Sequence, residues 1–491
     1  MTTAEFLSYG VGVVVLWLVA VRLRSAVARQ WLYLIFSLIF YFSWGSWLIV
    51  VLLFSALMNY CLGEWQKKRN TAGRLWMGII LNLILLSVFK YLPLIGAASP
   101  PHSPLAVLRR ILFPLGVSFW TFQAISYLFE LYREEELDPS LVEFLLYMAF
   151  WPTVLQGPVC RMSSMLPQFR QEWSVGEDDL KTGVRRIAIG VFMSVLAGVL
   201  GGGLYPGAGV DRAFDNTTAY RSGIDAWCLA VAYGFQLYFS FCGYSHVVIG
   251  AARLFGIRLH ENFNRPYLAT TPSAFWTRWH MSLSFWIRDF LFLPMTMRPG
   301  VLWRNLWLVI SMFIFGLWHK GTVLLMLWGI YHGLLLVLHR QWQELRKRTG
   351  FRWSGPLPAF ISWLVTFSSV SLGYIFFRSE NIRQAFNMLR AIATPSSYRH
   401  LTLDHSFYFM TLLAMAGYFA VIGGAELLDR LGDFARERGE TKPGAMPSLL
   451  RIVADERWVW ITPVVLVLGL YLGVIFHVGH SETGPVMYAL F

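Results

Sequence analysis

The sequence predicts an all-α polytopic membrane protein with about a dozen transmembrane or re-entrant helices. Of its 491 residues, 56% are hydrophobic and 14% are charged, whereas soluble domains average about a quarter charged residues. Mean hydropathy is +0.51, and apolar runs long enough to cross a bilayer recur along the chain. These observations exclude an ordinary soluble protein, a coiled coil, a collagen and a disordered chain.

The basic residues indicate topology rather than nucleic-acid binding. Lys and Arg number 41 and Asp and Glu 28, for a formal net charge of +13. The basic residues fall in short gaps between apolar runs, where they orient membrane proteins with their positive loops inside. Basic clusters at 67–69, 340–352 and 430–451 are therefore expected in the cytoplasm. The expected surroundings are membrane lipids, with no nucleic-acid partner.

The apolar runs predict the helices in chain order. The first, 6–21, follows Glu5 and precedes three arginines, so we expect an uncleaved first span with its N-terminus outside. Residues 32–62 are long enough for a hairpin, with a break near 43–46. The runs near Phe360 and Phe407 should form an out-and-back pair between two basic clusters. Further spans are expected at 75–95, 111–132, 141–159, 187–204, 226–254, 306–317, 323–338, 360–377, 407–427 and 458–478.

Breaks and cysteines add two expectations. Pro and Gly residues interrupt the runs around 114–116 and 152–158, and such breaks survive in a bilayer only where protein or water satisfies the freed backbone groups. The four cysteines are isolated and lack metal-type spacing, which predicts free thiols and no metal site. They are Cys61, Cys160, Cys228 and Cys242.

Histidines inside the apolar runs are the first candidates for chemistry, because no P-loop, dinucleotide fingerprint, HExxH or GxSxG motif occurs. Ionisable groups at membrane depth are costly and usually functional. His246, His280, His319 and His332 lie within runs or in the polar stretch 253–298.

The stretch 253–298 predicts a helix that starts after Thr271. On a continuous helix, His280, Ser284 and Arg288 would follow at i, i+4 and i+8 and share one face. That face would line a polar cavity. The alternative is an interfacial helix, whose tryptophans at 276, 279 and 286 anchor at headgroup depth.

His319 interrupts a strongly apolar stretch. A neutral imidazole there could take a proton from a hydroxyl nucleophile in a dry site; the alternative is an interhelical hydrogen bond. His332 lies 13 residues further on, a rotation of ~220° on an ideal helix. The two histidines therefore need separate roles if the helix is continuous.

An ordered set of motifs resembles the membrane-bound O-acyltransferase family, and most closely its branch of bacterial alginate O-acetylation and D-alanyl transfer proteins. Each motif alone is weak, but their order and spacing are specific. They are FPLGVSFWTFQ at 113–123, QGPVCR at 156–161, QLYF at 236–239, ENFNRPY at 261–267, FWTRWH and SLS within 275–284, WIRD at 286–289, GLWH at 316–319, WGIYHG at 328–333 and FFR at 376–378.

The resemblance implies a ring of membrane helices around a central tunnel. It implies that His319 is the essential catalytic histidine and that His280 is the second histidine of the site. It places N-terminal peripheral helices at 1–110, the catalytic core at 111–395 and C-terminal helices at 396–491. The residues expected to bind substrate are Asn264, Ser284, Arg288, Trp318 and His332.

The resemblance also implies a reaction. An acyl group, expected to be acetyl, would pass from a cytoplasmic thioester donor to a hydroxyl of an exported polysaccharide or cell-envelope polymer. The donor would be acetyl-coenzyme A or an acyl carrier protein, acting as a substrate, with no bound cofactor. An exported acetyltransferase could be a partner. The expected location is the bacterial inner membrane.

Three departures and three alternatives remain. Ser240 and His246 replace acids of the bacterial relatives, and a different turn stands at 293–298. Lys320 follows His319, and it would lower the basicity of His319 only if the lysine side chain points toward that histidine.

The chain could instead be a transporter or flippase with a histidine-lined path, or the membrane scaffold of a complex. An acyl-enzyme on Cys242 or Ser245 is a further possibility.

Overall fold

The computed structural model describes residues 3–203, 209–215, 222–297 and 300–439. Within these ranges the chain is helical and contains no β-strand, only an isolated bridge between Phe263 and Trp279. The predicted all-α class is confirmed. The chain divides into two compact units that interleave along the sequence, and the division predicted at 110 and 395 stays a prediction.

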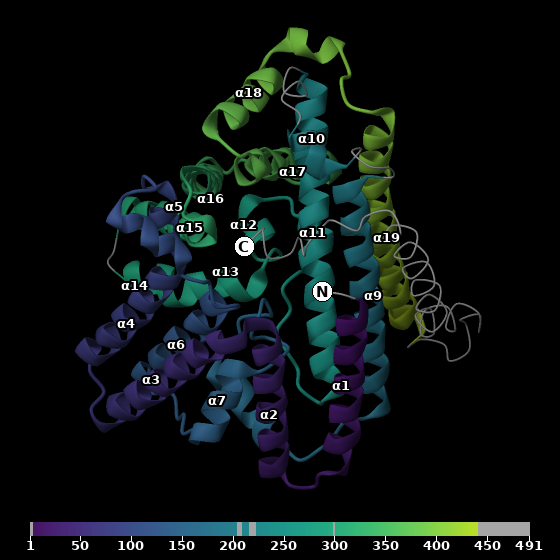
Figure 1. The fold of residues 1–491 in the computed structure, drawn as a ribbon. Helices are drawn as coiled ribbons and strands as arrows, with labels where there is room; N and C mark the ends of the chain where they lie inside the picture. The colour runs from purple at the N-terminus through teal and green to yellow at the C-terminus, as the bar shows by residue number, and fades with distance from the viewer. Residues whose placement is uncertain (1–2, 204–208, 216–221, 298–299, 440–491) are drawn as a thin grey trace. The chain divides into compact units, whose positions relative to one another are not determined.

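The first unit comprises Met1–Ile187, Val248–Asn262 and Ser282–Pro294. It contains most of the N-terminal helices (Figure 1) and a turn of π-helix, Arg288–Phe292, that follows α13. Its helices are α1 (Thr3–Arg22), α2 (Ala26–Gly45), α3 (Ile49–Lys68), α4 (Ala72–Lys90), α5 (Leu92–Ala98), α6 (Val117–Tyr132), α7 (Leu141–Ala149), α8 (Met162–Arg170), nearly all of α13 (Met281–Ile287), and most of α14 (Leu293–Met295).

The second unit comprises Ala188–Val247, Phe263–Met281 and Met295–Phe491. Two helices, α9 (Glu177–Gly202) and α11 (Gly223–Leu254), contribute to both units. The remaining helices of the second unit are α10 (Val210–Asp215), α12 (Pro272–Trp276), α15 (Val301–Lys320), α16 (Val323–Thr349), α17 (Pro356–Arg378), α18 (Ile382–Ala393) and α19 (His405–Gly439).

Eight stretches of the described chain are long and apolar enough to cross a membrane. The predicted break in 32–62 is confirmed at Ser46, whose φ of 48° separates α2 from α3. Helices α17 and α19 cover the runs predicted at 360–377 and 407–427, and their out-and-back crossing of the membrane stays a prediction. The run predicted at 458–478 lies outside the described residues. The structure thus describes fewer spans than the dozen expected.

Two predicted spans are shorter than their apolar runs. α6 has 16 residues and begins only after Gly116, which has φ 72°; α7 has nine residues and ends at Ala149. The buried, irregular segment that follows α7 contains the prolines and glycine that break the run. Protein groups satisfy part of its backbone, as expected for such a break. The Tyr147 hydroxyl donates to the Cys160 carbonyl at 2.9 Å, and Val159 N–H donates to Ser282 Oγ at 3.0 Å.

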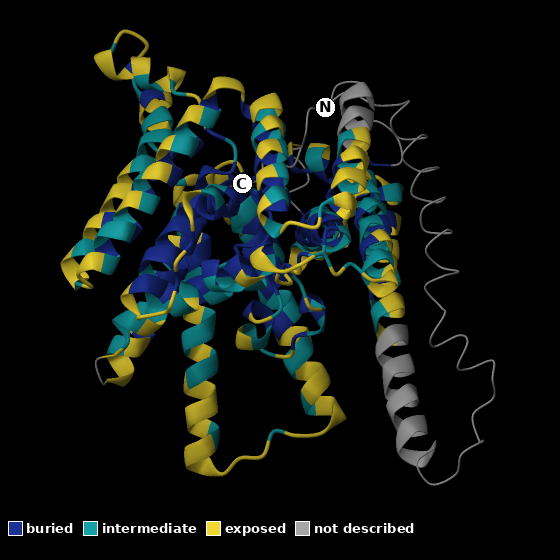
Figure 2. Ribbon diagram, turned by 90° about the horizontal axis from the view of Figure 1, so that it is seen from below, coloured by how far each residue is buried: buried dark blue, intermediate teal, exposed yellow. Residues whose placement is uncertain are grey.

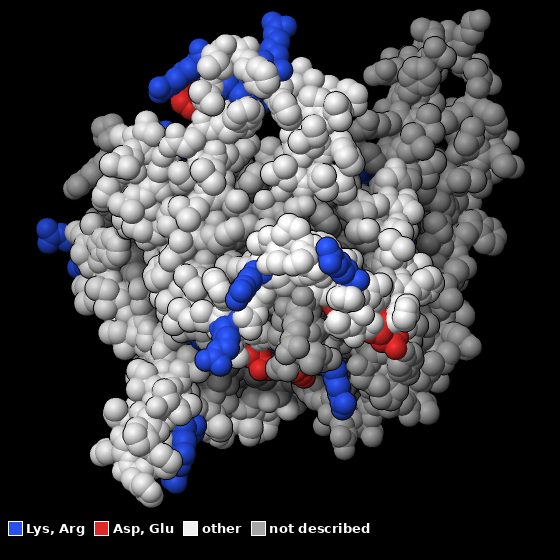
Figure 3. All heavy atoms as spheres, turned by 90° about the horizontal axis from the view of Figure 1, so that it is seen from above, with Lys and Arg blue, Asp and Glu red and all other residues white. Residues whose placement is uncertain are grey.

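Exposed apolar side chains cover the candidate spans, as a lipid-facing surface requires. α4, for example, exposes Trp76, Ile80 and Ile84. Exposed and half-buried residues run along the long helices in Figure 2, and Lys and Arg are sparse on the face in Figure 3. α11 differs, because 78% of its most apolar window is buried, against 22–33% for the other seven stretches.

Glycines bring α15 and α16 into close contact. A Cβ built on Gly316 would lie 2.0 Å from the Leu325 carbonyl oxygen, and one built on Gly329 would lie 2.2 Å from the Met312 carbonyl oxygen. Small residues spaced in this way let membrane helices pack backbone to backbone. This packing fixes the positions of the histidines that the two helices carry.

Candidate active site

His319 and His280 both lie near the Phe315 ring in the second unit. His319 is in the last turn of α15 and is buried. Its ring stacks on Phe315 with centroids 5.1 Å apart, and Phe315 is 6.4 Å from the His280 ring. Phe315 and His319 are four residues apart on one helical face. The two histidines that the family resemblance implies are therefore neighbours of one aromatic ring.

Three further aromatic rings lie around His319. The Trp318, Trp328 and Phe377 centroids lie 4.8, 5.5 and 5.0 Å from its own. Phe377 comes from the end of α17 and Trp328 from α16. The imidazole is thus held in an apolar, low-dielectric setting, where a proton transfer or a hydrogen bond is electrostatically stronger than in water.

His332 belongs to the same aromatic cluster, on a separate helix. α15 ends at Lys320 and α16 begins at Val323, so the continuous helix considered for 313–340 is not formed. The Trp328 ring lies 5.5 Å from the His319 ring and 5.0 Å from the His332 ring, so it contacts both. A Cβ on Gly373 would lie 2.6 Å from His332 Nε2. His332 is therefore packed tightly one ring away from His319.

His280 sits in a strained backbone position. Its φ is 44°, a left-handed conformation that costs a non-glycine residue about 1–3 kcal/mol and clusters at functional sites. Its ring meets Phe241 of α11 edge-on at 4.6 Å. Within the described chain its buried Nε2 has no hydrogen-bond partner. Burial lowers the pKa of His280 to about 3, so the imidazole is neutral at ordinary pH.

The expected common face of His280, Ser284 and Arg288 is wrong. The helix does start after Thr271, whose Oγ1 accepts from Ala274 N–H at 3.1 Å, but it ends at Trp276. His280 precedes α13, and Ser284 and Arg288 follow in the first unit. The alternative of tryptophan anchors is also wrong, because the indoles at 276, 279 and 286 are all buried.

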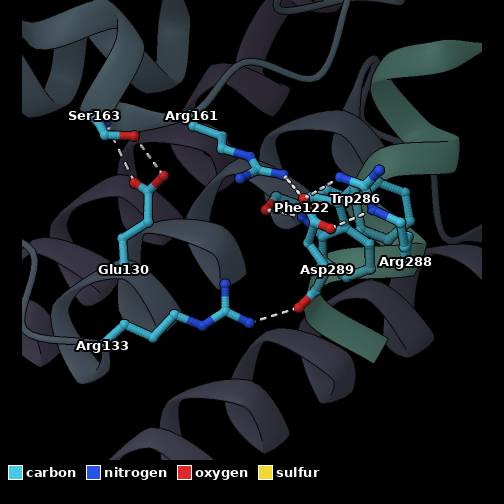
Figure 4. A network of polar contacts seen from close by, with 8 residues as sticks. All are labelled: Phe122, Glu130, Arg133, Arg161, Ser163, Trp286, Arg288 and Asp289. Atoms are coloured by element: carbon cyan, nitrogen blue, oxygen red, sulfur yellow. Dashed lines mark hydrogen bonds and ion pairs between the residues drawn. The ribbon is translucent and has the colours of Figure 1, made fainter. Parts of the chain in front are cut away.

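Arg288 instead takes part in a polar network of the first unit (Figure 4). Its guanidinium pairs with Asp289 at 2.6 Å, and Arg161 reaches the same carboxylate. Although partial burial works to raise it, the pKa of Asp289 is lowered, because both arginines donate to it. Arg133 donates to the Asp289 carbonyl at 2.6 Å. Nearby, the buried Glu130 accepts from Ser163 Oγ at 2.7 Å.

The other predicted substrate residues are distributed as follows. Trp318 packs beside His319. Asn264 lies on an exposed loop of the second unit, where its N–H donates to the Arg278 carbonyl at 2.9 Å. Ser284 is half-buried on α13. The structure therefore brings His280, His319, His332 and Trp318 together in the second unit. Asn264 lies on a loop of the same unit, and Ser284 and Arg288 belong to the first unit.

Four aromatic residues of the cluster do not appear among the sequence candidates. Phe315 and Trp328 each lie four residues before a candidate histidine, so the helical i, i+4 rule could have found them. Phe241 and Phe377 reach the cluster from α11 and α17, and only tertiary structure could place them there.

We expect His280→Asn to reduce the acid sensitivity of the fold. An unfolded histidine has a pKa near 6.5, whereas that of His280 is lowered to about 3. As pH falls below 6.5 the unfolded chain gains a proton that the folded chain does not, so stability falls. At pH 5 this group alone accounts for about 2 kcal/mol. Asparagine is the chosen replacement because it tolerates the left-handed backbone conformation at this position.

Thermal unfolding of the parent and of His280→Asn in detergent from pH 7.5 to pH 5 measures this difference. The variant should lose less stability over that range. Parallel losses in the two proteins would show that His280 is protonated in the folded state.

Comparison with known proteins shows which protein family this sequence matches. Residues 32–377 match the family model described as MBOAT, membrane-bound O-acyltransferase family. A peptidoglycan O-acetyltransferase of Helicobacter pylori is 32% identical over 74% of this chain and 73% of its own length. A probable alginate O-acetylase of Pseudomonas aeruginosa is 32% identical over 77% and 72%. A teichoic acid D-alanyltransferase of Streptococcus thermophilus is 28% identical over 70% and 82%.

Proposed function

Because this chain belongs to the membrane-bound O-acyltransferase family and is a membrane O-acyltransferase, we propose that it transfers an acetyl group from a cytoplasmic thioester to a hydroxyl of an exported polysaccharide or envelope polymer. Two of the relatives are named for O-acetylation of such polymers, which supports an acetyl group and this acceptor class. The observation that carries the proposal is the placement of His319 and His280 against the one ring of Phe315.

The proposed step uses His319 as the general base. Its imidazole takes the proton of the acceptor hydroxyl as the oxygen attacks the thioester carbonyl. The C–S bond then breaks, and the departing thiolate receives that proton from the imidazolium. His280 stays neutral and, in the tautomer with Nε2 protonated, would donate a hydrogen bond to the oxyanion or to the acceptor. Its buried Nε2, with no partner in the described part of the chain, supports this role.

The position of Lys320 supports a small role for that residue. Its side chain is exposed at the end of α15, where Gly321 ends the helix with φ 66°. A lysine that extends to the interface does little to a buried base. The replacement of a family glycine by Lys320 therefore leaves the proposed base intact.

The donor, partner and location complete the proposal. The donor is acetyl-coenzyme A or an acyl carrier protein, and both are anions that the basic loops would attract. The acyl group passes to the polymer directly or through an exported acetyltransferase. The bacterial inner membrane is the location that gives both substrates access. The central tunnel that would connect them stays a prediction, as does an acyl-enzyme on Cys242 or Ser245.

A donor-turnover assay tests the proposed function. Purified protein in detergent receives radiolabelled acetyl-coenzyme A or acetylated carrier protein, with alginate or peptidoglycan as acceptor, and the labelled polymer is counted. Thioester cleavage that depends on the acceptor supports the enzyme. Uptake of label into vesicles without cleavage would favour a transporter, and cleavage only with a second protein would favour the scaffold.

A further inference from the structure

Helix α18 (Ile382–Ala393) lies at a boundary of the membrane and is too short to cross it. Three residues separate it from the end of α17 at Arg378, and the chain returns to a long apolar helix at His405. Both α17 and the first part of α19 are candidate membrane spans. The 12 residues of α18 extend about 18 Å, whereas the hydrocarbon core of a bilayer is about 30 Å thick. α18 therefore lies where lipid headgroups meet water.

One side of α18 is held firmly against the second unit. The Asn381 side chain caps the first turn by accepting from Gln384 N–H at 2.9 Å, and the Gln384 amide donates to the Phe214 carbonyl at 2.8 Å. At the other end, Ser397 Oγ donates to the Ala391 carbonyl at 2.6 Å. The buried side chains of the helix are those of Gln384, Ala385, Met388 and Ala391. The helix thus presents a fixed outer face.

The outer face of α18 is divided into an apolar and a cationic side. Ile382 and Phe386 are 53% and 64% exposed, and because they are four residues apart they share one side of the helix. Arg383 and Arg390 are both exposed and share the neighbouring side, rotated by about 70° on an ideal helix. Apolar and basic residues side by side on the outer face are typical of helices that lie in the membrane interface.

The two arginines have no protein counter-ion. Neither guanidinium makes a hydrogen bond or an ion pair with the part of the chain that the structure describes, and α18 contains no acidic residue. A guanidinium binds a phosphate through paired N–H donors. A phosphate that is attached to acyl chains would match both sides of the outer face, whereas a soluble phosphate would leave Ile382 and Phe386 in water.

Membrane orientation does not account for these arginines. Basic loops next to spans lie in the cytoplasm, and of the two basic clusters expected there, 340–352 precedes α17 and 430–451 follows the apolar part of α19. If α17 and α19 cross as predicted, residues 379–404 lie on the opposite face of the membrane. Arginines are less common on that face, so a local partner explains them better than topology does.

We propose that α18 is an interfacial helix that binds anionic phospholipid. Ile382 and Phe386 enter the acyl region of one leaflet, and the guanidinium groups of Arg383 and Arg390 bind headgroup phosphates. Attraction to anionic lipids adds to the burial of apolar side chains when amphipathic helices bind membranes. The proposal does not rest on the proposed function, since no step of acyl transfer uses α18.

A photo-crosslinking experiment on the full chain identifies what covers this face. Phe386→p-benzoylphenylalanine places a photoreactive ring on the apolar side, and the protein is irradiated in nanodiscs that contain equal amounts of phosphatidylcholine and phosphatidylglycerol. Mass spectrometry of the labelled peptide counts the adducts of each lipid. Lipid adducts are expected, and those of phosphatidylglycerol should be roughly fivefold or more in excess, the effect of one basic residue near an anionic membrane surface.

Two double variants separate the charge from the apolar contact. Arg383→Gln with Arg390→Gln should remove the preference for phosphatidylglycerol and leave lipid adducts at position 386, whereas Arg383→Lys with Arg390→Lys should keep most of the preference. The matched control for position is Asn387→p-benzoylphenylalanine, because Asn387 is exposed on the polar side of α18 and should give few lipid adducts. Thermal unfolding of each variant checks folding.

Three results would overturn the proposal. The first is that position 386 forms adducts with protein or forms none, and the second is that the preference for phosphatidylglycerol survives the two glutamine substitutions. The third is that the parent binds an acidic polysaccharide such as alginate and the double glutamine variant does not, with lipid adducts unchanged, which would assign the face to an exported polymer. Acetyl transfer is assayed separately, so failure of this proposal and failure of the proposed function are distinguishable.

Discussion

His319→Ala is expected to slow acetyl transfer by about 10²- to 10⁴-fold, the usual contribution of a positioned general base. Four aromatic rings lie around His319, those of Phe315, Trp318, Trp328 and Phe377. None of these side chains can accept a proton. Donor turnover with and without acceptor, measured at several pH values in detergent, gives the effect on the rate.

The matched control for this variant is His400→Ala, which removes an exposed histidine after the last 3₁₀ turn. It should retain full activity. The unfolding midpoints of both variants show whether activity is lost because the base is missing or because the protein is unfolded. His319→Gln is a second test of the base, because glutamine keeps a polar side chain of similar length but has no basic nitrogen. If the folded His319→Ala variant transferred acetyl groups at the parent rate, His319 would not be the general base.

The sequence was most informative where apolar length and helical spacing decide the structure. Long apolar runs without proline became the membrane helices, since a bilayer forces each backbone amide to bond within its own helix. The GLWH histidine was found because a polar group in such a run is costly. Phe315 and Trp328 could also have been predicted from helical spacing, because each lies one helical turn before a candidate histidine.

The position of His280 could not be predicted from periodicity. No proline or glycine separates Trp276 from His280, and yet the helix ends there. Tertiary contacts stabilise the turn: Trp279 pairs with Phe263 in an isolated bridge, and the His280 ring packs on Phe241. These partners are distant in sequence, so helical spacing alone suggested one continuous face for His280, Ser284 and Arg288, which the structure does not form.

Gly329→Ala is expected to destabilise the protein by about 3 kcal/mol or more, at the upper end of the cost of overpacking a core. The added methyl group would lie 2.2 Å from the Met312 carbonyl oxygen, and backbone cannot rotate away as a side chain can. α15 and α16 would have to separate, and His319 and His332 would move with them. Activity should therefore fall together with the unfolding midpoint.

Gly417→Ala on α19 is the control, because a Cβ at that position meets nothing within 4 Å. In a helix interior the same substitution adds up to about 1 kcal/mol of stability through helix propensity, so the two variants should shift the unfolding midpoint in opposite directions. Since both replace a glycine in a membrane-spanning helix, the contrast isolates the contact between α15 and α16. Equal midpoints would mean that the two helices can separate at no cost, and that something other than their close approach positions the histidines.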